Sequence, residues 1–229
     1  MSLGRPQSVP RSEEELQARV RALAGHTLGA LAGRLGLEAP PNLRRHKGWV
    51  GQLLEDLLGA TAASRSEPDF QAISVELKSL PVDARGMPRE STYVCHVPLS
   101  ALHGLTWETS PTRRKLARVL WVPVEAMPEV PLAERRVGAA LLWSPEPDQE
   151  HMLREDWEDL VERIRLGYVD TITGHDGQVL QIRPKGADSK ATMWGVGESG
   201  EPVEIMPRGW YLRASFTREI LRRHYALPA

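Results

Sequence analysis

Residues 72–81, AISVELKSLP, alternate apolar and polar side chains over a short stretch of the chain. The apolar members are Ile73, Val75 and Leu77. A period of two is that of a β-strand with one buried face, so Glu76 and Lys78 are expected to project together from the opposite face. Two interpretations of this pair are open. It is either an exposed face with a weak ion pair or part of a catalytic site.

Helical patterns occur in five segments of the chain. Ser12 followed by Glu15 forms a capping-box pattern, which predicts a helix from Ser12 toward residue 23. The other predicted helices lie within residues 26–37, 47–60, 148–167 and 215–227. Apolar side chains recur at helical spacing in residues 47–60 and 148–167, whereas glycines weaken the pattern in residues 26–37. We expect Ser215 or Thr217 to cap the last helix.

Further strands are expected at residues 91–99, 117–125, 178–184 and 208–214. Residues 83–90 contain Gly86 and predict a turn, so residues 91–99 are expected to form a return strand. Residues 138–143 are ambiguous between strand and helix. Strands and helices mix without a strict βαβ rhythm, which predicts an α/β or α+β protein with a mixed central sheet. A boundary near residue 168 is possible, although no flexible linker marks it.

Composition limits the class of protein. The 229 residues are 41% hydrophobic and 26% charged, as in ordinary globular proteins. Cys95 is the only cysteine, so no internal disulfide can form. We find no secretion signal and no run of eighteen apolar residues. We therefore expect a cytoplasmic protein with no membrane partner.

The formal net charge of −1 does not by itself indicate a nucleic-acid binder. Basic residues nevertheless gather in residues 44–47, 112–118 and 208–224, whereas acidic residues gather elsewhere. Such segregation can leave one positive face on a neutral protein. On charge alone, ordinary solvated surface is the better interpretation.

Asp69 precedes Glu76 by seven positions, which gives the pattern D-x6-E-x-K with Lys78. Two carboxylates and the Leu77 carbonyl could hold Mg²⁺, which prefers oxygen ligands. Such an ion activates water and offsets phosphate charge in phosphodiester cleavage, while a lysine holds the water or the phosphate. The triplet alone is a weak signal, because E-x-K is common on protein surfaces.

A helix carboxylate could complete such a site, and residues 47–60 supply two adjacent candidates, Glu55 and Asp56. Helical geometry leaves both open. Other chemistries lack their motifs: the histidines have no zinc-ligand spacing, and neither a P-loop nor G-x-S-x-G is present. Trp210 and Tyr211 lie between arginines, and contact with nucleic acid and core packing are equal alternatives for them.

Seven segments together resemble the MutH family of mismatch-repair endonucleases over nearly the whole chain. They are NLRRHKGWVGQLLE, DFQAISVELKSLPVD, TWETS, RRVGAALLWSP, LREDWEDL, LQIRPK and PRGWYLR. The resemblance implies a restriction-endonuclease-like α/β fold, with a mixed central sheet flanked by helices and two arms forming a DNA cleft. A catalytic arm would span roughly residues 12–167, and a DNA-recognition arm roughly residues 168–229.

The resemblance also implies roles for individual residues. Asp69 and Glu76, with the Leu77 carbonyl, would hold Mg²⁺, and Mn²⁺ or Ca²⁺ could occupy the same site. Lys78 would be the catalytic lysine. Glu55, rather than Asp56, would be the helix carboxylate that completes the site, and it could serve as a further metal ligand.

The DNA-binding residues implied by the resemblance are Lys47, Tyr93, Lys115, Arg183, Pro184, Lys185, Gly186 and Tyr211. An arginine or lysine can bond both O6 and N7 of guanine. Tyr211 matches a tyrosine near the adenine amino group, where an aromatic wall can sense a methyl group. Tyr93 matches a position that holds phenylalanine in relatives; it keeps the ring and adds a hydroxyl.

The implied activity is nicking of the unmethylated strand 5′ to GATC in hemimethylated DNA. MutL would activate the enzyme, MutS would act indirectly, and the protein would be a monomer. Two alternatives stay open. One is a type II restriction endonuclease that cuts both strands at GATC, and the other is a catalytically inert DNA-binding scaffold.

Overall fold

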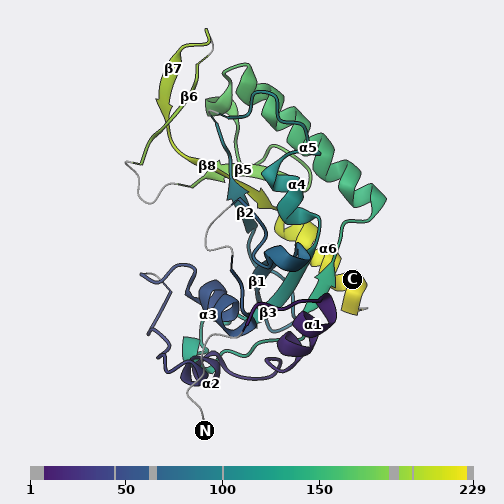
Figure 1. Cartoon of the computed structure of the whole chain (residues 1–229). Helices are drawn as coiled ribbons and strands as arrows, with labels where there is room; N and C mark the ends of the chain where they lie inside the picture. The colour runs from purple at the N-terminus through teal and green to yellow at the C-terminus, as the bar shows by residue number, and fades with distance from the viewer. Residues whose placement is uncertain are drawn as a thin grey trace. The chain divides into compact units, whose positions relative to one another are not determined.

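The computed structural model describes residues 8–43, 45–61, 66–99, 101–185, 191–197 and 199–225 (Figure 1). Within them, the α-helices are α1 (Glu13–Arg21), α2 (Leu28–Arg34), α3 (Trp49–Leu58), α4 (Pro111–Leu116), α5 (Pro147–Arg165) and α6 (Ala214–Tyr225). The strands are β1 (Glu76–Val82), β2 (Thr92–His96), β3 (Val119–Glu125), β4 (Leu141–Trp143), β5 (Leu180–Pro184), β6 (Met193–Val196), β7 (Pro202–Ile205) and β8 (Arg208–Leu212).

The chain forms two compact units that interleave along the sequence. The first unit takes the described residues of 1–89, 117–144 and 224–227, and the second those of 90–116 and 145–223. The chain thus crosses between the units near residues 89, 116, 144 and 223, and no unit boundary falls near residue 168. Whether these units act as a catalytic and a recognition arm around DNA stays a prediction.

The first unit is built on the mixed sheet β1-β3-β4. β1 runs parallel to β3, from the pair Glu76–Val119 to the pair Val82–Glu125, and β4 runs antiparallel to β3. Helix α3 packs against β1 and against α1 and α2. Six consecutive residues of β3, 119–124, are buried, as expected for a central strand covered on both faces.

The second unit is built on the antiparallel sheet β2-β8-β5, with β6 and β7 as a separate hairpin. Helix α5 packs against β5. Trp157 of α5 stacks on Trp210 of β8, with ring centroids 6.5 Å apart, and Trp107 lies 6.0 Å from Trp157. Trp210 has no exposed surface, so core packing, not contact with nucleic acid, is its role.

The mixture of helices and strands confirms the α/β class. The described strands form two three-stranded sheets and one hairpin, however, and not the single mixed central sheet that was expected. Residues 91–99 do not return beside β1, because β2 pairs with β8 in the second unit. Residues 138–143 contain a strand, β4. Helix α6 begins at Ala214, so Ser215 and Thr217 lie inside the helix and the predicted cap is wrong. The sequence patterns also missed α4, β6 and β7.

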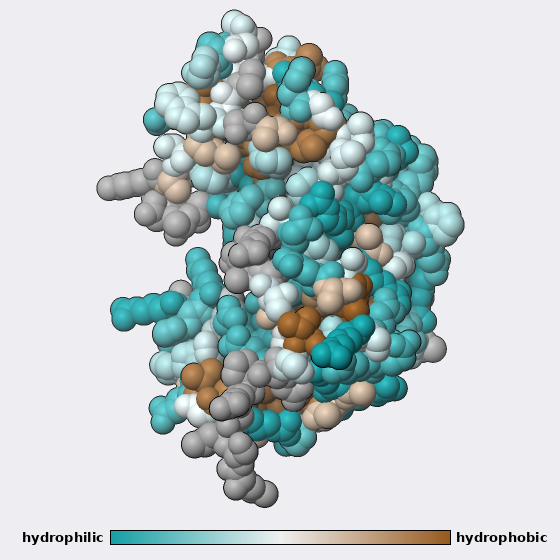
Figure 2. Space-filling view, viewed as in Figure 1, coloured by the Kyte–Doolittle hydropathy of each residue, from teal (hydrophilic) through white to brown (hydrophobic). Residues whose placement is uncertain are grey.

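Ser12 caps α1 as expected, because its hydroxyl accepts a hydrogen bond from the Glu15 backbone. No described helix is long and apolar enough to cross a membrane. The face shown in Figure 2 is mainly hydrophilic, with small apolar patches. Large apolar side chains that are exposed among the described residues include Leu166, Tyr168 and Trp194.

Candidate functional site

A tight loop brings Asp69 to the beginning of β1. Phe70 and Val75 exchange backbone hydrogen bonds across it, at 2.9 and 3.3 Å, and both side chains are fully buried. Between them, residues 71–73 form a 3-10 turn, and Ser74 takes a left-handed conformation with φ 54°. The Leu77 backbone N–H therefore reaches Asp69 Oδ2 at 2.8 Å.

The strand is shorter than the alternating pattern predicted, because β1 begins at Glu76 rather than near residue 72. The left-handed conformation at Ser74 is incompatible with a continuous strand. A non-glycine residue in this region carries local strain, which persists only where its surroundings hold it. Here the strained loop is what places Asp69 beside Leu77.

Glu76 and Lys78 form an ion pair that is largely withdrawn from solvent. Lys78 Nζ lies 2.5 Å from Glu76 Oε1, and the side chains are 14% and 1% exposed. The interpretation as a solvated face with a weak pair is therefore wrong. A buried carboxylate is costly unless it is paired and hydrogen-bonded.

Glu55 is coupled electrostatically to these residues from α3. Its side chain is half-buried, and burial raises the pKa of the Glu55 carboxyl above its usual value. The negative charge of Asp69 raises this pKa further, whereas Lys78 lowers it. Asp56 instead accepts a hydrogen bond from Gln52 Nε2 at 2.9 Å on the surface of its own helix. The structure therefore favours Glu55 over Asp56 as the third carboxylate.

The donor chemistry at the start of β1 fits a hard divalent cation, because carboxylate and carbonyl oxygens are the ligands that Mg²⁺ prefers. Asp69, Glu76 and the Leu77 carbonyl are the groups that could hold it. Within the part of the chain that the structure describes, no three His, Cys, Asp or Glu side chains are already arranged to bind a metal.

Two of the three predicted DNA-binding lysines, Lys47 and Lys115, lie in different units. Lys47 is exposed in the turn before α3, and Gly48 caps that helix with φ 88°. Lys47 thus belongs to the same unit as Glu55, Asp69 and Glu76. Lys115 lies in α4 of the second unit and is only 7% exposed.

Four predicted recognition residues gather on one face of the sheet β2-β8-β5. Tyr93 pairs with Tyr211 across β2 and β8, and their rings meet edge to face with centroids 5.4 Å apart. Lys185 Nζ lies 4.5 Å from the centroid of the Tyr93 ring, and Arg183 Cζ lies 5.9 Å from that of Tyr211. Such contacts between cations and aromatic faces are favourable. We refer to Tyr93, Arg183, Lys185 and Tyr211 as the ring–cation cluster.

The local backbone explains why these side chains converge. The register of β2 against β8 shifts between Tyr93 and Cys95, and a bulge of this kind re-aims the side chains beside it. Pro184 is exposed opposite Arg208 at the end of β5, and the Lys185 N–H is held by the Pro207 carbonyl at 2.7 Å. Gly186 lies outside the described residues.

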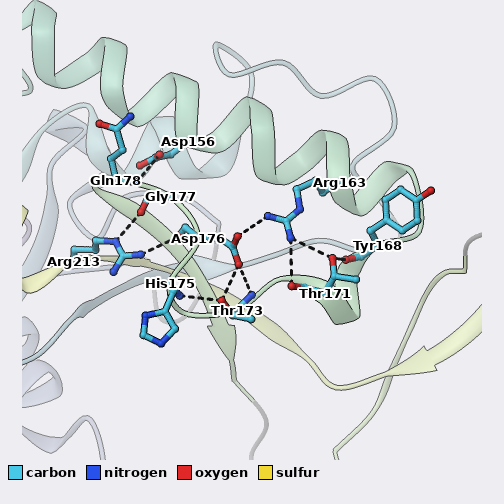
Figure 3. Close-up of polar contacts among 10 residues, drawn as sticks. All are labelled: Asp156, Arg163, Tyr168, Thr171, Thr173, His175, Asp176, Gly177, Gln178 and Arg213. Carbon is cyan, nitrogen blue, oxygen red and sulfur yellow. Dashed lines mark hydrogen bonds and ion pairs between the residues drawn. The ribbon is translucent and has the colours of Figure 1, made fainter.

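A network of hydrogen bonds fixes the opposite end of β5 (Figure 3). Asp156 of α5 is 6% exposed and accepts three backbone N–H bonds at 2.7 Å, from Gln178, Val179 and Leu180. Asp156 anchors the strand that carries Arg183.

The turn that precedes β5 is braced by two arginines. Asp176 accepts hydrogen bonds from Arg163 at 2.8 Å and from Thr173, and these bonds lower its pKa to about 2. Arg213 donates to the Gly177 carbonyl at 2.9 Å and to the Asp176 carbonyl at 3.1 Å. Figure 3 shows both arginines pointing into this turn.

Comparison with known proteins gives the family. The model of the family described as DNA mismatch repair enzyme MutH matches residues 58–156. The DNA mismatch repair protein MutH of Escherichia coli K12 is 52% identical over 228 residues, which cover 99% of this chain and 100% of that protein. The protein of the same name from Yersinia enterocolitica is 52% identical over 222 residues, 97% of each chain. The chain belongs to the MutH family.

Membership of the MutH family confirms the resemblance drawn from the sequence segments. The matched residues 58–156 include Asp69, Glu76, Lys78 and Tyr93. The similarity to whole MutH proteins extends beyond them, over almost the entire chain. It therefore includes α3 with Glu55 and the C-terminal strands of the ring–cation cluster.

Sequence reasoning missed two residues that hold the ring–cation cluster. Arg183 Nη1 donates to Ser91 Oγ at 2.8 Å, and Gly209 lies directly among the side chains of the cluster. No pattern pointed to Ser91. A glycine inside the strand pattern RGWYL was a usable signal, because such a glycine often marks a close approach of neighbouring groups.

Proposed function

We propose that this protein is a Mg²⁺-dependent endonuclease that nicks the unmethylated strand 5′ to GATC in hemimethylated DNA during mismatch repair. The observation that carries the proposal is the withdrawn pair Glu76–Lys78 beside Asp69, in a member of the MutH family. A solvated surface would not need a carboxylate that is 1% exposed. A site that hydrolyses a charged phosphodiester does need charged groups held in fixed positions away from bulk water.

The residues of this site divide the work of hydrolysis. Asp69, Glu76 and the Leu77 carbonyl would hold Mg²⁺, which when bound supplies positive charge to the phosphate and lowers the pKa of water. Lys78, held beside Glu76, would donate a hydrogen bond to the attacking water or to a phosphate oxygen. Glu55 would orient that water from α3. The backbone bond from Leu77 to Asp69 keeps the first carboxylate in place.

The ring–cation cluster supports sequence reading by the second unit. Arg183 and Lys185 carry the donors that can bond O6 and N7 of guanine in the major groove. Tyr211 presents an aromatic edge that an N6-methyl group on adenine would meet, and methylation also removes one hydrogen-bond donor. Tyr93 braces both Tyr211 and Lys185. Together these contacts favour recognition of GATC and of its methylation state.

The proposed partners follow from the same family membership. Double-stranded DNA containing GATC is the substrate, MutL is the activator, and MutS acts indirectly. A chain with a net charge of −1 has little general attraction for DNA, which fits recruitment by a partner. We propose that the protein acts as a monomer in the cytoplasm.

Duplexes with a single GATC site test this function. Unmethylated, hemimethylated and fully methylated duplexes, with each strand labelled, are incubated with protein and Mg²⁺, with and without MutL and ATP. We expect nicks only in unmethylated strands and stimulation by MutL. Double-strand cuts independent of MutL would instead identify a restriction endonuclease, and GATC binding without cutting would identify a scaffold.

A further inference from the structure

Gly209 of β8 occupies the centre of the ring–cation cluster. It is buried and lies opposite Arg183 on one side and His96 on the other. A Cβ atom at this position would lie 2.9 Å from Tyr93 Cε2, 3.2 Å from Lys185 Cβ and 3.2 Å from Tyr211 Cε2. Carbon atoms in favourable contact are about 3.5–4.0 Å apart, so three members of the cluster close over the space that a side chain would fill.

The backbone conformation does not require glycine at this position. Gly209 is not among the glycines with positive φ, and it forms regular strand pairs with both neighbours. Glycine weakens a strand interior, so another property must favour it. That property is the missing side chain, which lets the Tyr93 ring approach Tyr211 and Lys185.

The closest contact is also the least adaptable one. Tyr93 Cε2 belongs to a rigid ring, which is held by Tyr211 at 5.4 Å and by His96 at 5.7 Å between centroids. A methyl group at residue 209 would displace that ring, and Lys185 packs on the same ring. The positions of the Tyr93 ring and of the Lys185 side chain therefore depend on the absence of a side chain at Gly209.

We propose that Gly209 is a positioning residue for base recognition, which sets where Tyr93 and Lys185 meet the DNA bases. This inference rests on the proposed function and adds a specificity determinant that contacts no base through a side chain. Its consequence is selective. Enlarging residue 209 shifts the groups that read bases but leaves Glu55, Asp69, Glu76 and Lys78 unchanged in the first unit.

The variant Gly209→Ala tests this role against Gly174→Ala as control. Gly174 lies in the same unit, but a Cβ there would make only ordinary contacts, the nearest at 3.7 Å. Single-turnover nicking is measured on a GATC duplex and on duplexes with one base pair changed. Loss of one good base contact is worth about 1–3 kcal/mol, so we expect the ratio of the two rates to fall about tenfold or more in Gly209→Ala. The control should keep the wild-type ratio.

Variants of Tyr93 show whether Gly209 acts through that ring. We expect Gly209→Ala to change the ratio less when it is added to Tyr93→Ala, because the closest of the three contacts, with Tyr93 Cε2, is gone, and the effects of contacting residues are non-additive. If Gly209→Ala alone does not fold, the double variant compared with Tyr93→Ala decides the question. A double variant that also fails to fold, while Tyr93→Ala folds, would make Gly209 a structural residue and overturn the proposal.

The remaining outcomes separate this inference from the proposed function. An unchanged ratio in Gly209→Ala, or an equal loss of rate on every duplex, would overturn the positioning role. A wild-type protein without preference for GATC would overturn the proposed function itself, whatever the variant does. Thermal unfolding and affinity for a duplex without GATC are measured in parallel, and both should match the control.

Discussion

Lys78 Nζ lies 2.5 Å from Glu76 Oε1, and the glutamate is 1% exposed. Removing the cation breaks the ion pair of a poorly solvated carboxylate, which typically costs about 3–5 kcal/mol. We therefore expect Lys78→Met to lose nicking and to lower the free energy of unfolding by about 3 kcal/mol. Chemical denaturation and a nicking assay measure the two effects.

The double variant Glu76→Gln, Lys78→Met separates stability from chemistry at this pair. Neutralising both members of the pair removes the poorly solvated charge, so we expect much of the stability to return while nicking stays absent. Recovery of nicking in the double variant would mean that the pair is structural and that hydrolysis occurs elsewhere.

Glu55 links stability to pH. Burial raises the pKa of its carboxyl in the folded protein, so the ionised form opposes folding. Its destabilising effect is absent below the unfolded pKa of about 4.3 and grows as pH rises through the folded pKa. We expect Glu55→Gln to be more stable than wild type near neutral pH, with a difference that vanishes on acidification to about pH 4.

Denaturant unfolding of wild type and Glu55→Gln across this pH range, without divalent ions, measures that difference. Asp56→Asn is the matched control, because Asp56 bonds to Gln52 on the helix surface. The same Glu55 variant should lose nicking, whereas the control should keep it. A Glu55→Gln variant that nicks normally would remove this residue from the site.

Variants of Asp156 test whether its carboxylate stabilises the start of β5, the strand that carries Arg183. Its carboxylate accepts three backbone N–H groups at 2.7 Å, and each donor left unsatisfied costs about 1–3 kcal/mol. We expect Asp156→Ala to lower the unfolding free energy by about 3 kcal/mol or more, and Asp156→Asn to lose less. Glu158→Gln, at an exposed position on the same helix, should change stability by less than about 0.5 kcal/mol.

Variants of Tyr211 test whether this ring senses the methyl group on the adenine of GATC. Tyr211→Ala removes the ring that contacts Tyr93, so we expect the rate ratio between unmethylated and fully methylated GATC duplexes to fall about tenfold. Tyr211→Phe keeps the ring and should keep most of that ratio. Equal ratios in Tyr211→Ala and wild type would show that the adenine methyl group is sensed by other residues.

The sequence pointed to most residues of the candidate site but not to their surroundings. The D-x6-E-x-K spacing pointed to Asp69, Glu76 and Lys78, but periodicity could not reveal the left-handed Ser74 that ends the strand early. Periodicity put Glu76 and Lys78 on the same face of the strand but left open whether that face is exposed. Burial of the Glu76 side chain depends on pairing with β3 and on packing of α3, contacts made by residues distant in sequence.

The recognition residues show the same limit. Arg183, Lys185 and Tyr211 came from family resemblance, whereas their convergence with Tyr93 depends on pairing of β2 with β8. A local turn at Gly86 predicted a hairpin instead, because turn residues signal a reversal but not the partner of the next strand. Gly209 had no role until its neighbours were located.

The most direct test of the account compares wild type with Glu76→Gln on one hemimethylated GATC duplex in Mg²⁺. Nicking is measured under single-turnover conditions, and binding to the same duplex is measured in parallel. We predict that wild type nicks only the unmethylated strand, and that Glu76→Gln loses nicking by a factor of at least about 100, as expected for loss of transition-state charge stabilisation, while it still binds the duplex. Nicking by Glu76→Gln at the wild-type rate would contradict the assignment of the hydrolytic site.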